Sequence, residues 1–321
     1  MAKPHIVIIS PYLQNANNGN WQTAWRWSRF LSKKYKITLA LEWDGCACDA
    51  MIALHARRSA TSIAAFADTF PELPLIVVLT GTDLYRDIGS DESAQHSLQV
   101  ATQLIILQAA GLQVLDKRLH AKTQVIYQSA PSLKPVKHNP KKLPRFFDVT
   151  MVGHLRGEKD PATFMHAVQS LESASIRMIH IGGALDPGLA AQAEKTQELY
   201  PRYHWLGNVA HAATRQRLKR SQLMVITSRM EGGANVIIEA VTSGVPVLAS
   251  DISGNRGMLG ENYAGYFPVG DSKKLAQLID QAASDANFYR RLQTQCAARA
   301  EFFSPERERK TLLKLIDRCI T

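Results

Sequence analysis

The sequence lacks any apolar run long enough to cross a membrane. Its longest apolar stretches, such as residues 73–80, have the length of a strand, whereas a membrane helix needs about 18 apolar residues in a row. The N-terminal stretch has strand character with no small-residue cleavage site behind it. Four cysteines in 321 residues are too few for a disulfide scaffold, and the close pair Cys46 and Cys48 lies in a polar turn. We expect a cytoplasmic protein with reduced cysteines and without stable membrane insertion.

Charge of one sign is in excess. Lys and Arg number 38 against 28 Asp and Glu, which gives a formal net charge of +10. A basic balance favours anionic partners in general, whether nucleic acid, a membrane surface or phosphorylated small molecules. The sequence carries no recognised nucleic-acid-binding motif, so we expect no nucleic-acid partner.

Short β-rich runs alternate with helical stretches along the whole chain, which predicts an α/β fold with doubly wound parallel sheets. The strands are expected at 5–9, 37–41, 51–54, 75–79, 104–107, 124–126, 147–152, 176–181, 204–206, 223–227, 246–249 and 265–267. A proline-rich, basic stretch without periodicity separates the two groups of strands. The predicted organisation is an N-terminal Rossmann-like domain, a linker, a second Rossmann-like domain and a terminal helix, over residues 1–133, 134–146, 147–304 and 305–321. Because ligands bind at the carboxyl ends of such strands, both domains are expected to face an interdomain cleft.

Two helical patterns have plain structural interpretations. Trp21, Trp25 and Phe30 recur at near-helical spacing and are expected in the core. The basic residues of the second pattern are expected on a solvated helix face: Arg215, Arg217, Lys219 and Arg220.

The stretch 227–250 carries the most informative motif. A strand ends at its beginning, Gly232 and Gly233 form a tight turn, and a helix starts near Ala234 or Asn235. Free N–H groups at a helix start attract anions, and glycine lets a phosphate approach the backbone closely.

Two glutamates flank this turn. Glu231 precedes the helix and Glu239 lies about one turn inside it. A nucleotide-sugar with its diphosphate at the helix start would place one hydroxylated ring at each carboxylate. The alternative is that Glu231 is a cap-region acid and Glu239 a solvated helix residue.

A second element of the same kind covers residues 152–164. Arg156 and Lys159 follow an expected strand, and a helix is expected to be capped near Asp160 with Pro161 at its first position. The two cations can neutralise a diphosphate leaving group. The alternative is that both are simply solvated.

These two elements resemble the retaining, nucleotide-sugar-dependent glycosyltransferases of the GT-B fold. Glu231 and Glu239 match that family's pair of glutamates with seven residues between them, and Arg156 and Lys159 match its diphosphate pair. The resemblance implies that Glu231 contacts the transferred sugar and Glu239 the ribose. It also implies a metal-independent reaction without a cofactor and a terminal helix that crosses back to the N-terminal domain. The remaining donor contacts would come from Gly232, Gly233, Ala234, Asn235 and, in the nucleobase loop 205–208, Leu206.

Polar groups also follow three strands of the first half. Gly19 and Asn20 lie in a turn and helix start where GT-B enzymes admit donor phosphate and acceptor. Because this turn has one glycine, it is no dinucleotide fingerprint, and a nicotinamide cofactor is disfavoured. The adjacent pair Arg57 and Arg58 favours a small anionic acceptor. The other candidate acceptor contacts are Thr80, Thr82 and Asp83.

Two of these positions keep alternative interpretations. His55 either orients a phosphate and donates a proton, as a catalytic residue, or is satisfied by the backbone at the end of a strand. Asp83 either contacts the acceptor or caps the turn that follows.

Five segments together narrow the family: ALHARRSA at 53–60, VLTGTDLYRD at 78–87, VIYQSA at 125–130, GNRGMLG at 254–260 and GYFPVGD at 265–271. They are similar to the selenosugar synthases of selenoneine biosynthesis. The resemblance implies a UDP-hexose donor, with UDP-N-acetylglucosamine first among the candidates, and selenophosphate as acceptor. The product would be a 1-seleno-sugar, formed with release of UDP and phosphate.

Three other functions stay open. A GT-B transferase acting on a lipid or glycan acceptor would need an exposed amphipathic helix, for which residues 21–31 are the candidate. A UDP-sugar epimerase on the same fold would need acid and base carboxylates and no second substrate. A nucleic-acid-binding protein would need a continuous cationic face.

Overall fold

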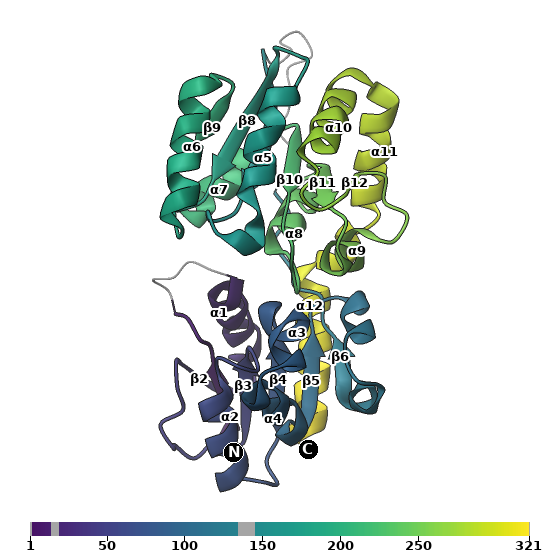
Figure 1. Cartoon of the computed structure of the whole chain (residues 1–321). Helices are drawn as coiled ribbons and strands as arrows, with labels where there is room; N and C mark the ends of the chain where they lie inside the picture. The colour runs from purple at the N-terminus through teal and green to yellow at the C-terminus, as the bar shows by residue number, and fades with distance from the viewer. Residues whose placement is uncertain (1, 14–18, 134–144, 321) are drawn as a thin grey trace. The chain divides into compact units, whose positions relative to one another are not determined.

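The computed structural model describes residues 2–13, 19–133 and 145–320. By its internal contacts the chain divides into two compact units (Figure 1). Unit 1 comprises Met1–Ser129, Glu231–Ala234 and Phe302–Thr321, and unit 2 comprises Ala130–Met230 and Asn235–Glu301. The limits at 129 and 301 lie a few residues from the expected 133 and 304, whereas Glu231–Ala234, expected within the second domain, falls in unit 1. Only the last two residues of the expected linker 134–146 lie within the described part of the chain.

Unit 1 is built on one parallel sheet with the strand order β2-β1-β3-β4-β5-β6. The strands are β1 His5–Ile9, β2 Lys36–Ala40, β3 Ala50–Leu54, β4 Leu75–Leu79, β5 Gln103–Ile106 and β6 Thr123–Val125. Its α-helices are α1 Gly19–Leu31, α2 Ala60–Thr69, α3 Thr82–Tyr85, α4 Glu92–Val100 and α12 Pro305–Ile320.

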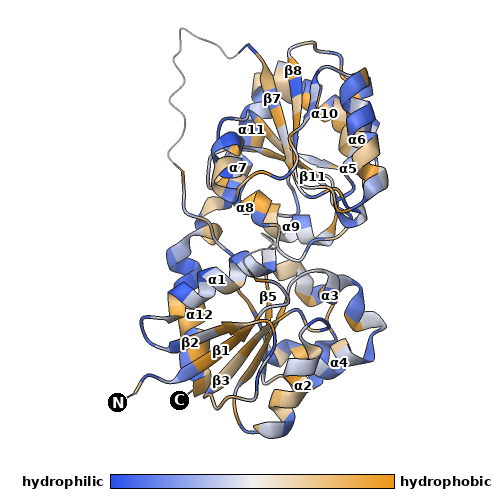
Figure 2. Cartoon of the chain, turned by 90° about the vertical axis from the view of Figure 1, so that its left-hand side faces the viewer, coloured by the Kyte–Doolittle hydropathy of each residue, from blue (hydrophilic) through white to orange (hydrophobic). Residues whose placement is uncertain are grey.

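The strands of unit 1 are buried on both faces, as the near-continuous apolar runs of parallel strands require. In β1, Ile6 and Ile8 pack with α1 and α12, whereas Val7 and Ile9 pack with α2 and α4. Figure 2 shows β1, β3 and β5 in the orange of hydrophobic residues. The alternation of side chains along a strand therefore supplies two separate cores.

The buried face of α1 differs from the sequence prediction. The helix buries Thr23, Ala24, Trp27 and Leu31, so Trp27 is the core tryptophan. Trp25 is 46% exposed and stacks on Trp21 with 5.6 Å between ring centroids. The expectation that Trp25 is a core residue was wrong, because the apolar stripe of α1 is set by Trp27 and its neighbours one turn away.

Unit 2 contains a second parallel sheet with the order β12-β11-β10-β7-β8-β9. Its strands are β7 Phe147–Val152, β8 Ile176–Ile181, β9 Tyr203–Trp205, β10 Leu223–Ile226, β11 Val247–Ser250 and β12 Tyr266–Phe267. Its α-helices are α5 Pro161–Ala167, α6 Pro187–Leu199, α7 His211–Leu218, α8 Asn235–Val241, α9 Ser253–Leu259, α10 Ser272–Ser284 and α11 Ala286–Ala297. Aspartates cap several of these helices; Asp271, for example, accepts the N–H of Lys274 at 2.8 Å.

Every strand expected from the sequence is present, with its ends within one residue of the expected ones. The doubly wound α/β class is therefore confirmed. Between α11 and α12 a separate 3-10 helix covers Ala300–Phe303.

A buried carboxylate joins α12 to the start of the chain. Glu308 accepts hydrogen bonds from Arg26 Nε at 2.8 Å, from Trp27 Nε1 at 2.6 Å and from the hydroxyl of Ser129. Its side chain is fully buried. A buried charge is tolerated only when it is paired and hydrogen-bonded, and these partners supply both conditions. Glu308 therefore fixes the yellow C-terminal helix of Figure 1 on α1.

We predict that Glu308→Gln lowers the free energy of unfolding by about 3 kcal/mol, because the amide leaves the Arg26 guanidinium uncompensated. Urea unfolding followed by tryptophan fluorescence measures this, since Trp27 lies in the cluster. The matched control is Glu306→Gln, an exposed position of the same helix, which is expected to change stability by less than about 0.5 kcal/mol. Equal losses in the two variants would contradict the role of Glu308.

Candidate functional site

The end of β3 presents His55 in an unusual backbone conformation. Its φ of 75° lies in the left-handed region, which is rare for a residue with a side chain. The imidazole is buried, and its Nδ1 accepts the backbone N–H of Arg58 at 3.3 Å. The ring hydrogen is therefore on Nε2, which donates to Thr82 Oγ1 at 3.0 Å. Both ring nitrogens are engaged by the protein, and in this state the ring is a donor at Nε2.

Asp83 holds the ends of two strands together. Its Oδ1 accepts the N–H groups of Thr80 at 2.9 Å and Gly81 at 2.8 Å, and its Oδ2 accepts the N–H of Ala56 at 3.0 Å. The side chain is fully buried. Of the two interpretations of Asp83, these contacts describe the cap: the carboxylate positions the loops after β3 and β4.

Asp83→Asn is expected to lower the free energy of unfolding by about 2 kcal/mol, because one amide oxygen replaces an acceptor of three N–H groups. Thermal unfolding followed by circular dichroism measures the loss. Asp68→Asn, at an exposed position of α2, is the control and should unfold like the wild-type protein. A wild-type melting temperature in the Asp83 variant would count against the role of Asp83 in holding the loops after β3 and β4.

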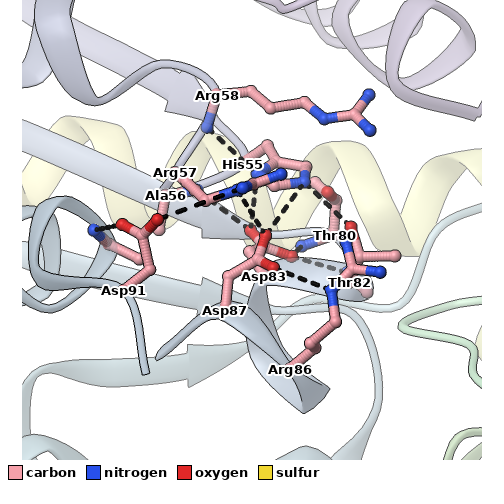
Figure 3. A network of polar contacts seen from close by, with 12 residues as sticks. His55, Ala56, Arg57, Arg58, Thr80, Thr82, Asp83, Arg86, Asp87 and Asp91 are labelled. Carbon is pink, nitrogen blue, oxygen red and sulfur yellow. Dashed lines mark hydrogen bonds and ion pairs between the residues drawn. The ribbon is translucent and has the colours of Figure 1, made fainter. Parts of the chain in front are cut away.

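The arginines beside His55 are compensated to different degrees (Figure 3). Arg57 Nε lies 3.0 Å from Asp87 Oδ2, and Arg86 Nε lies 2.9 Å from Asp87 Oδ1. The guanidinium carbon of Arg58 instead lies 5.1 Å from the ring centroid of Tyr12, and Nη1 of Arg58 donates a hydrogen bond to the Tyr12 hydroxyl. Tyr12 is uncharged, so within the described residues Arg58 makes no ion pair. Of the expected acceptor residues, Arg58 thus offers the least compensated positive charge.

The other candidate residues of unit 1 lie just after a strand or at the start of a helix. Thr80 and Thr82 follow β4 and contact Asp83 and His55 as described. Gly19 and Asn20 form the first turn of α1, where the Gly19 carbonyl accepts the Thr23 hydroxyl at 2.8 Å. Residues 14–18, which precede this turn, lie outside the described part of the chain.

The segment Glu231–Ala234 belongs to unit 1 through its glycines. A Cβ on Gly232 would lie 2.4 Å from the Thr80 carbonyl oxygen, and one on Gly233 would lie 2.7 Å from Leu107 Cβ. Both positions therefore require glycine for packing against protein atoms. The sequence argument assigned these glycines to the approach of a phosphate, and the packing supplies a reason of its own.

In unit 2, the ends of β7 and β8 approach each other closely. A Cβ on Gly182 would lie 1.9 Å from the Gly153 carbonyl oxygen, so no other residue fits there without a shift of the backbone. His180 donates from Nε2 to that carbonyl at 3.1 Å, and its Nδ1 accepts from the Tyr203 hydroxyl at 2.9 Å. These contacts fix the start of the loop that carries Arg156 and Lys159.

Burial lowers the pKa of His180 to about 4, against 6.5 for a solvated histidine, although its bond to Gly153 opposes the shift. Between pH 6.5 and 4, His180 is protonated in the unfolded chain but stays neutral in the folded chain. Stability is therefore expected to fall between pH 6.5 and 4, by roughly 3 kcal/mol, and this contribution levels off below pH 4.

Urea midpoints at pH 7, 6, 5 and 4 measure this loss. His180→Gln removes the titrating group, so its stability should fall less steeply over the same range. Parallel profiles for the two proteins would show that His180 does not carry the pH dependence.

Arg156 and Lys159 lie in the loop between β7 and α5. Arg156 is partly buried, and its Nε has no hydrogen-bond partner within the described residues. The Lys159 side chain lies along Gly153, 3.6 Å from an added Cβ. The helix α5 begins with Pro161 after Asp160, as expected, and Asp160 has a left-handed φ of 45°. No side-chain bond from Asp160 caps the helix; its carboxylate accepts the Thr163 hydroxyl at 2.8 Å.

Sequence reasoning missed His154, which stands two residues before Arg156. Its Nδ1 accepts the N–H of Gly183 at 3.0 Å, so the ring hydrogen is on Nε2. Burial, Arg156 and Lys159 lower its pKa, which keeps the ring neutral near pH 7. A histidine directly after a strand and beside two cations was the available signal.

Glu239 is 8% exposed and accepts a hydrogen bond from His211 Nε2 at 2.6 Å. The alternative of a solvated helix residue was therefore wrong. His211 was also missed, because 28 residues separate it from Glu239 and nothing in the sequence pairs them. Arg215 departs from the expected solvated face as well: its Nη2 donates to the Pro131 carbonyl at 2.6 Å.

Leu206 stands at the end of β9 and is partly exposed. Its N–H donates to the His180 carbonyl at 2.9 Å, and the neighbouring Trp205 Nε1 donates to the Gly182 carbonyl at 2.8 Å. The nucleobase loop of the sequence analysis is therefore tied to the end of β8. Asn235 begins α8, and Ala234 is buried just before it.

The described residues were compared with the requirements of a metal site and of a membrane-spanning helix. They hold no group of three or more His, Cys, Asp or Glu side chains placed to bind a metal ion. Their helices include none that is long and apolar enough to span a membrane.

The family of glycosyl transferases group 1 matches residues 135–299, more than half of the chain. The chain belongs to this family. A search of curated proteins gave no match.

Solved structures show the same fold at low identity. Sucrose-phosphate synthase from Thermosynechococcus elongatus has a TM-score of 0.77 at 15% identity over 98% of each chain. Anabaena Alr3699/HepE in complex with UDP and glucose has a TM-score of 0.72 at 16% identity, with 98% of this chain and 100% of that chain covered. A mutant of TarM from S. aureus, in complex with fondaparinux, alpha-GlcNAc-glycerol and UDP, has a TM-score of 0.69 at 18% identity over 84% of this chain. The present chain spans 55% of that TarM chain. Two Rossmann-like units of this kind define the GT-B fold.

Proposed function

We propose that this chain is a UDP-sugar-dependent glycosyltransferase that transfers a hexosyl group, N-acetylglucosaminyl in the first instance, to selenophosphate. The observation that carries the acceptor assignment is the guanidinium of Arg58, which stands at a strand end with a neutral partner, Tyr12. The seleno-sugar product would serve selenoneine biosynthesis, as the resemblance of five sequence segments implies.

The donor assignment rests on unit 2 and on membership of the family. The HepE structure is described as holding UDP and glucose, and we extend a UDP-sugar to this chain. Glu239 would bind the ribose, and Leu206 would contact the base. The buried Arg156 Nε, which has no hydrogen-bond partner within the described residues, is a donor suited to a phosphate oxygen. Arg156 and Lys159 would stabilise the departing UDP, and the proposed reaction, as the family resemblance implies, would use no metal or other cofactor.

The acceptor assignment rests on the charges beside His55. Asp83 is occupied by three backbone N–H groups, and Asp87 by two guanidiniums. His55 is a hydrogen donor at Nε2. In this cluster the carboxylates are engaged by N–H groups or guanidiniums and His55 is engaged at both ring nitrogens, which leaves Arg58 as the cation without an ionic partner among the described residues. A nucleophile that is already anionic, such as selenophosphate, suits it better than a hydroxyl that must lose a proton.

The proposed reaction has two steps, transfer of the sugar to selenium and hydrolysis of the selenium–phosphorus bond. Selenium attacks the anomeric carbon, the carbon–selenium bond forms, and the carbon–oxygen bond to the diphosphate breaks with its electron pair leaving on UDP. Water then attacks phosphorus, the selenium–phosphorus bond breaks, and phosphate and the seleno-sugar are released. Glu231 would contact the transferred sugar, and Arg57 and Arg58 would align the acceptor.

One observation favours a second candidate, a transferase with a lipid acceptor. The exposed indole of Trp25 stacks on Trp21 and lies under Arg29, whose guanidinium carbon is 5.9 Å from the ring centroid. An exposed aromatic and cationic helix face is the kind of surface that lies at a membrane interface.

Purified protein is incubated with UDP-N-acetylglucosamine, with and without selenophosphate, and UDP and product masses are followed by liquid chromatography and mass spectrometry. We expect UDP release that depends on selenophosphate, together with the mass of the seleno-sugar. UDP release without a selenium-containing product would refute the proposal. Release stimulated by anionic lipid vesicles in place of selenophosphate would identify the second candidate, and interconversion of UDP-sugars without UDP release would identify an epimerase.

Variants separate the two halves of the proposal. Arg58→Ala is expected to raise the KM for selenophosphate about tenfold, the loss of one charge-assisted contact, with UDP affinity unchanged. Arg156→Ala and Glu231→Ala are expected to lower kcat by about a hundredfold or more. Arg118→Ala is the control, because Arg118 is exposed and pairs only with Asp116 among the described residues.

A further inference from the structure

A histidine and a glutamate from two different helices of unit 2 are in contact. His211 is the first residue of α7, and Glu239 lies in α8. Their contact, from Nε2 to Oε1, is 2.6 Å long. A carboxylate has only acceptor oxygens, so Nε2 carries the hydrogen and donates it. The histidine side chain is 40% exposed, whereas that of the glutamate is 10% exposed.

The contact gives the two oxygens of Glu239 different environments. Within the described residues, His211 is the hydrogen-bond donor to this carboxylate, and it uses Oε1. Oε2 accepts no hydrogen bond from the described residues. A largely buried carboxylate with one oxygen held by the protein, and the other without a hydrogen bond from the described residues, is oriented to receive a hydroxyl group.

We propose that His211 is a positioning residue that sets the preference of the nucleotide site for a ribose diol. The inference rests on the proposed function, in which Glu239 binds the ribose of the UDP-sugar. His211 holds Oε1 and the plane of the carboxylate, and Oε2 accepts the sugar hydroxyls. The substrate class it selects is a ribonucleoside diphosphate rather than its deoxy counterpart.

The helix that carries His211 is fixed at several points. The Thr214 hydroxyl donates to the Val209 carbonyl at 3.2 Å, and Leu218 is fully buried. Arg215, one turn after His211 on the same helix face, donates to the Pro131 carbonyl. A side chain on a fixed helix loses little further freedom when it holds a partner, which is the condition for orienting one.

The connection from β9 to α7 links this contact to the base loop. It begins after Trp205 and includes Leu206, and it ends at His211. Gly207, with a φ of 65°, turns the chain there, and its carbonyl accepts the Gly182 N–H at 2.9 Å. This short connection therefore contains the residue assigned to the base and leads directly into the residue that orients the ribose carboxylate.

The test measures the dissociation constants of UDP and of 2′,3′-dideoxy-UDP by isothermal titration calorimetry, with kcat and KM for the UDP-sugar alongside. The wild-type protein is expected to bind UDP at least tenfold more tightly than the dideoxy compound. In His211→Ala this ratio should fall toward one, with KM raised about tenfold and kcat changed less than threefold. In His211→Gln, whose amide nitrogen reaches the position of Nε2, the ratio should be largely restored, and in His211→Asn it should not.

The matched control is Arg217→Ala, an exposed residue of the same helix, which should keep the wild-type ratio. If the wild-type protein binds no UDP, the proposed function itself fails. If it binds UDP and Glu239→Ala loses the preference while His211→Ala keeps it, only the role of His211 is overturned. If Glu239→Ala keeps the preference, the ribose is read elsewhere and the inference is overturned with the Glu239 assignment. Should His211→Ala not fold, the contrast between the Gln and Asn variants decides the outcome.

Discussion

Parallel strands leave unpaired backbone groups where they end, and the candidate residues of this protein lie where those groups find new partners. Within a sheet each N–H and C=O belongs to a ladder, but beyond the last pair it must be satisfied by something else. Asp83 takes three such N–H groups in unit 1. In unit 2 His180 takes the carbonyl of Gly153, and His154 takes the N–H of Gly183. The side chains that complete the backbone at these ends thereby also fix the loops in which Arg58 and Arg156 lie.

Buried charged side chains, like the backbone groups at the strand ends, need partners. Buried carboxylates are stable only with partners, and each one discussed above has them: Glu308 has Arg26, Asp87 has two guanidiniums, and Glu239 has His211. Two of the candidate cations, by contrast, are incompletely paired among the described residues, a feature that the buried Nε of Arg215 shares. Arg58 faces an uncharged phenol, and the Nε of Arg156 is buried without a hydrogen-bond partner among the described residues. A net positive charge spread over the chain indicated an anionic ligand, whereas the pairing pattern indicates which cations are available to one.

The fold could be predicted closely from the sequence, because strand-forming runs and helix starts are local signals. Residues such as Ile6–Ile9 are apolar throughout, and that pattern alone requires a strand covered on both faces. Individual side-chain roles were harder to predict. Trp25 and Trp27 differ by two positions in an aromatic-rich helix, and only the packing of α1 on the sheet and α12 decides which of them is buried. Contacts such as His211 with Glu239 join residues far apart in sequence, so no spacing rule reveals them. Gly232 looked like a phosphate-binding glycine, yet its Cβ position is filled by the Thr80 carbonyl.

The placement of α12 has a consequence for biosynthesis. Unit 1 takes its last helix from the end of the described chain, and the residues of unit 2 are synthesised between the first and the last of its three segments. Until α12 leaves the ribosome, the sheet face formed by Ile6, Ile8 and Ile52 lacks Leu312 and Ile316 as its cover. The N-terminal unit is therefore expected to finish folding after the unit that follows it, with an apolar face exposed in the meantime. Such a nascent chain would be a natural client for chaperones that shield apolar surface during translation.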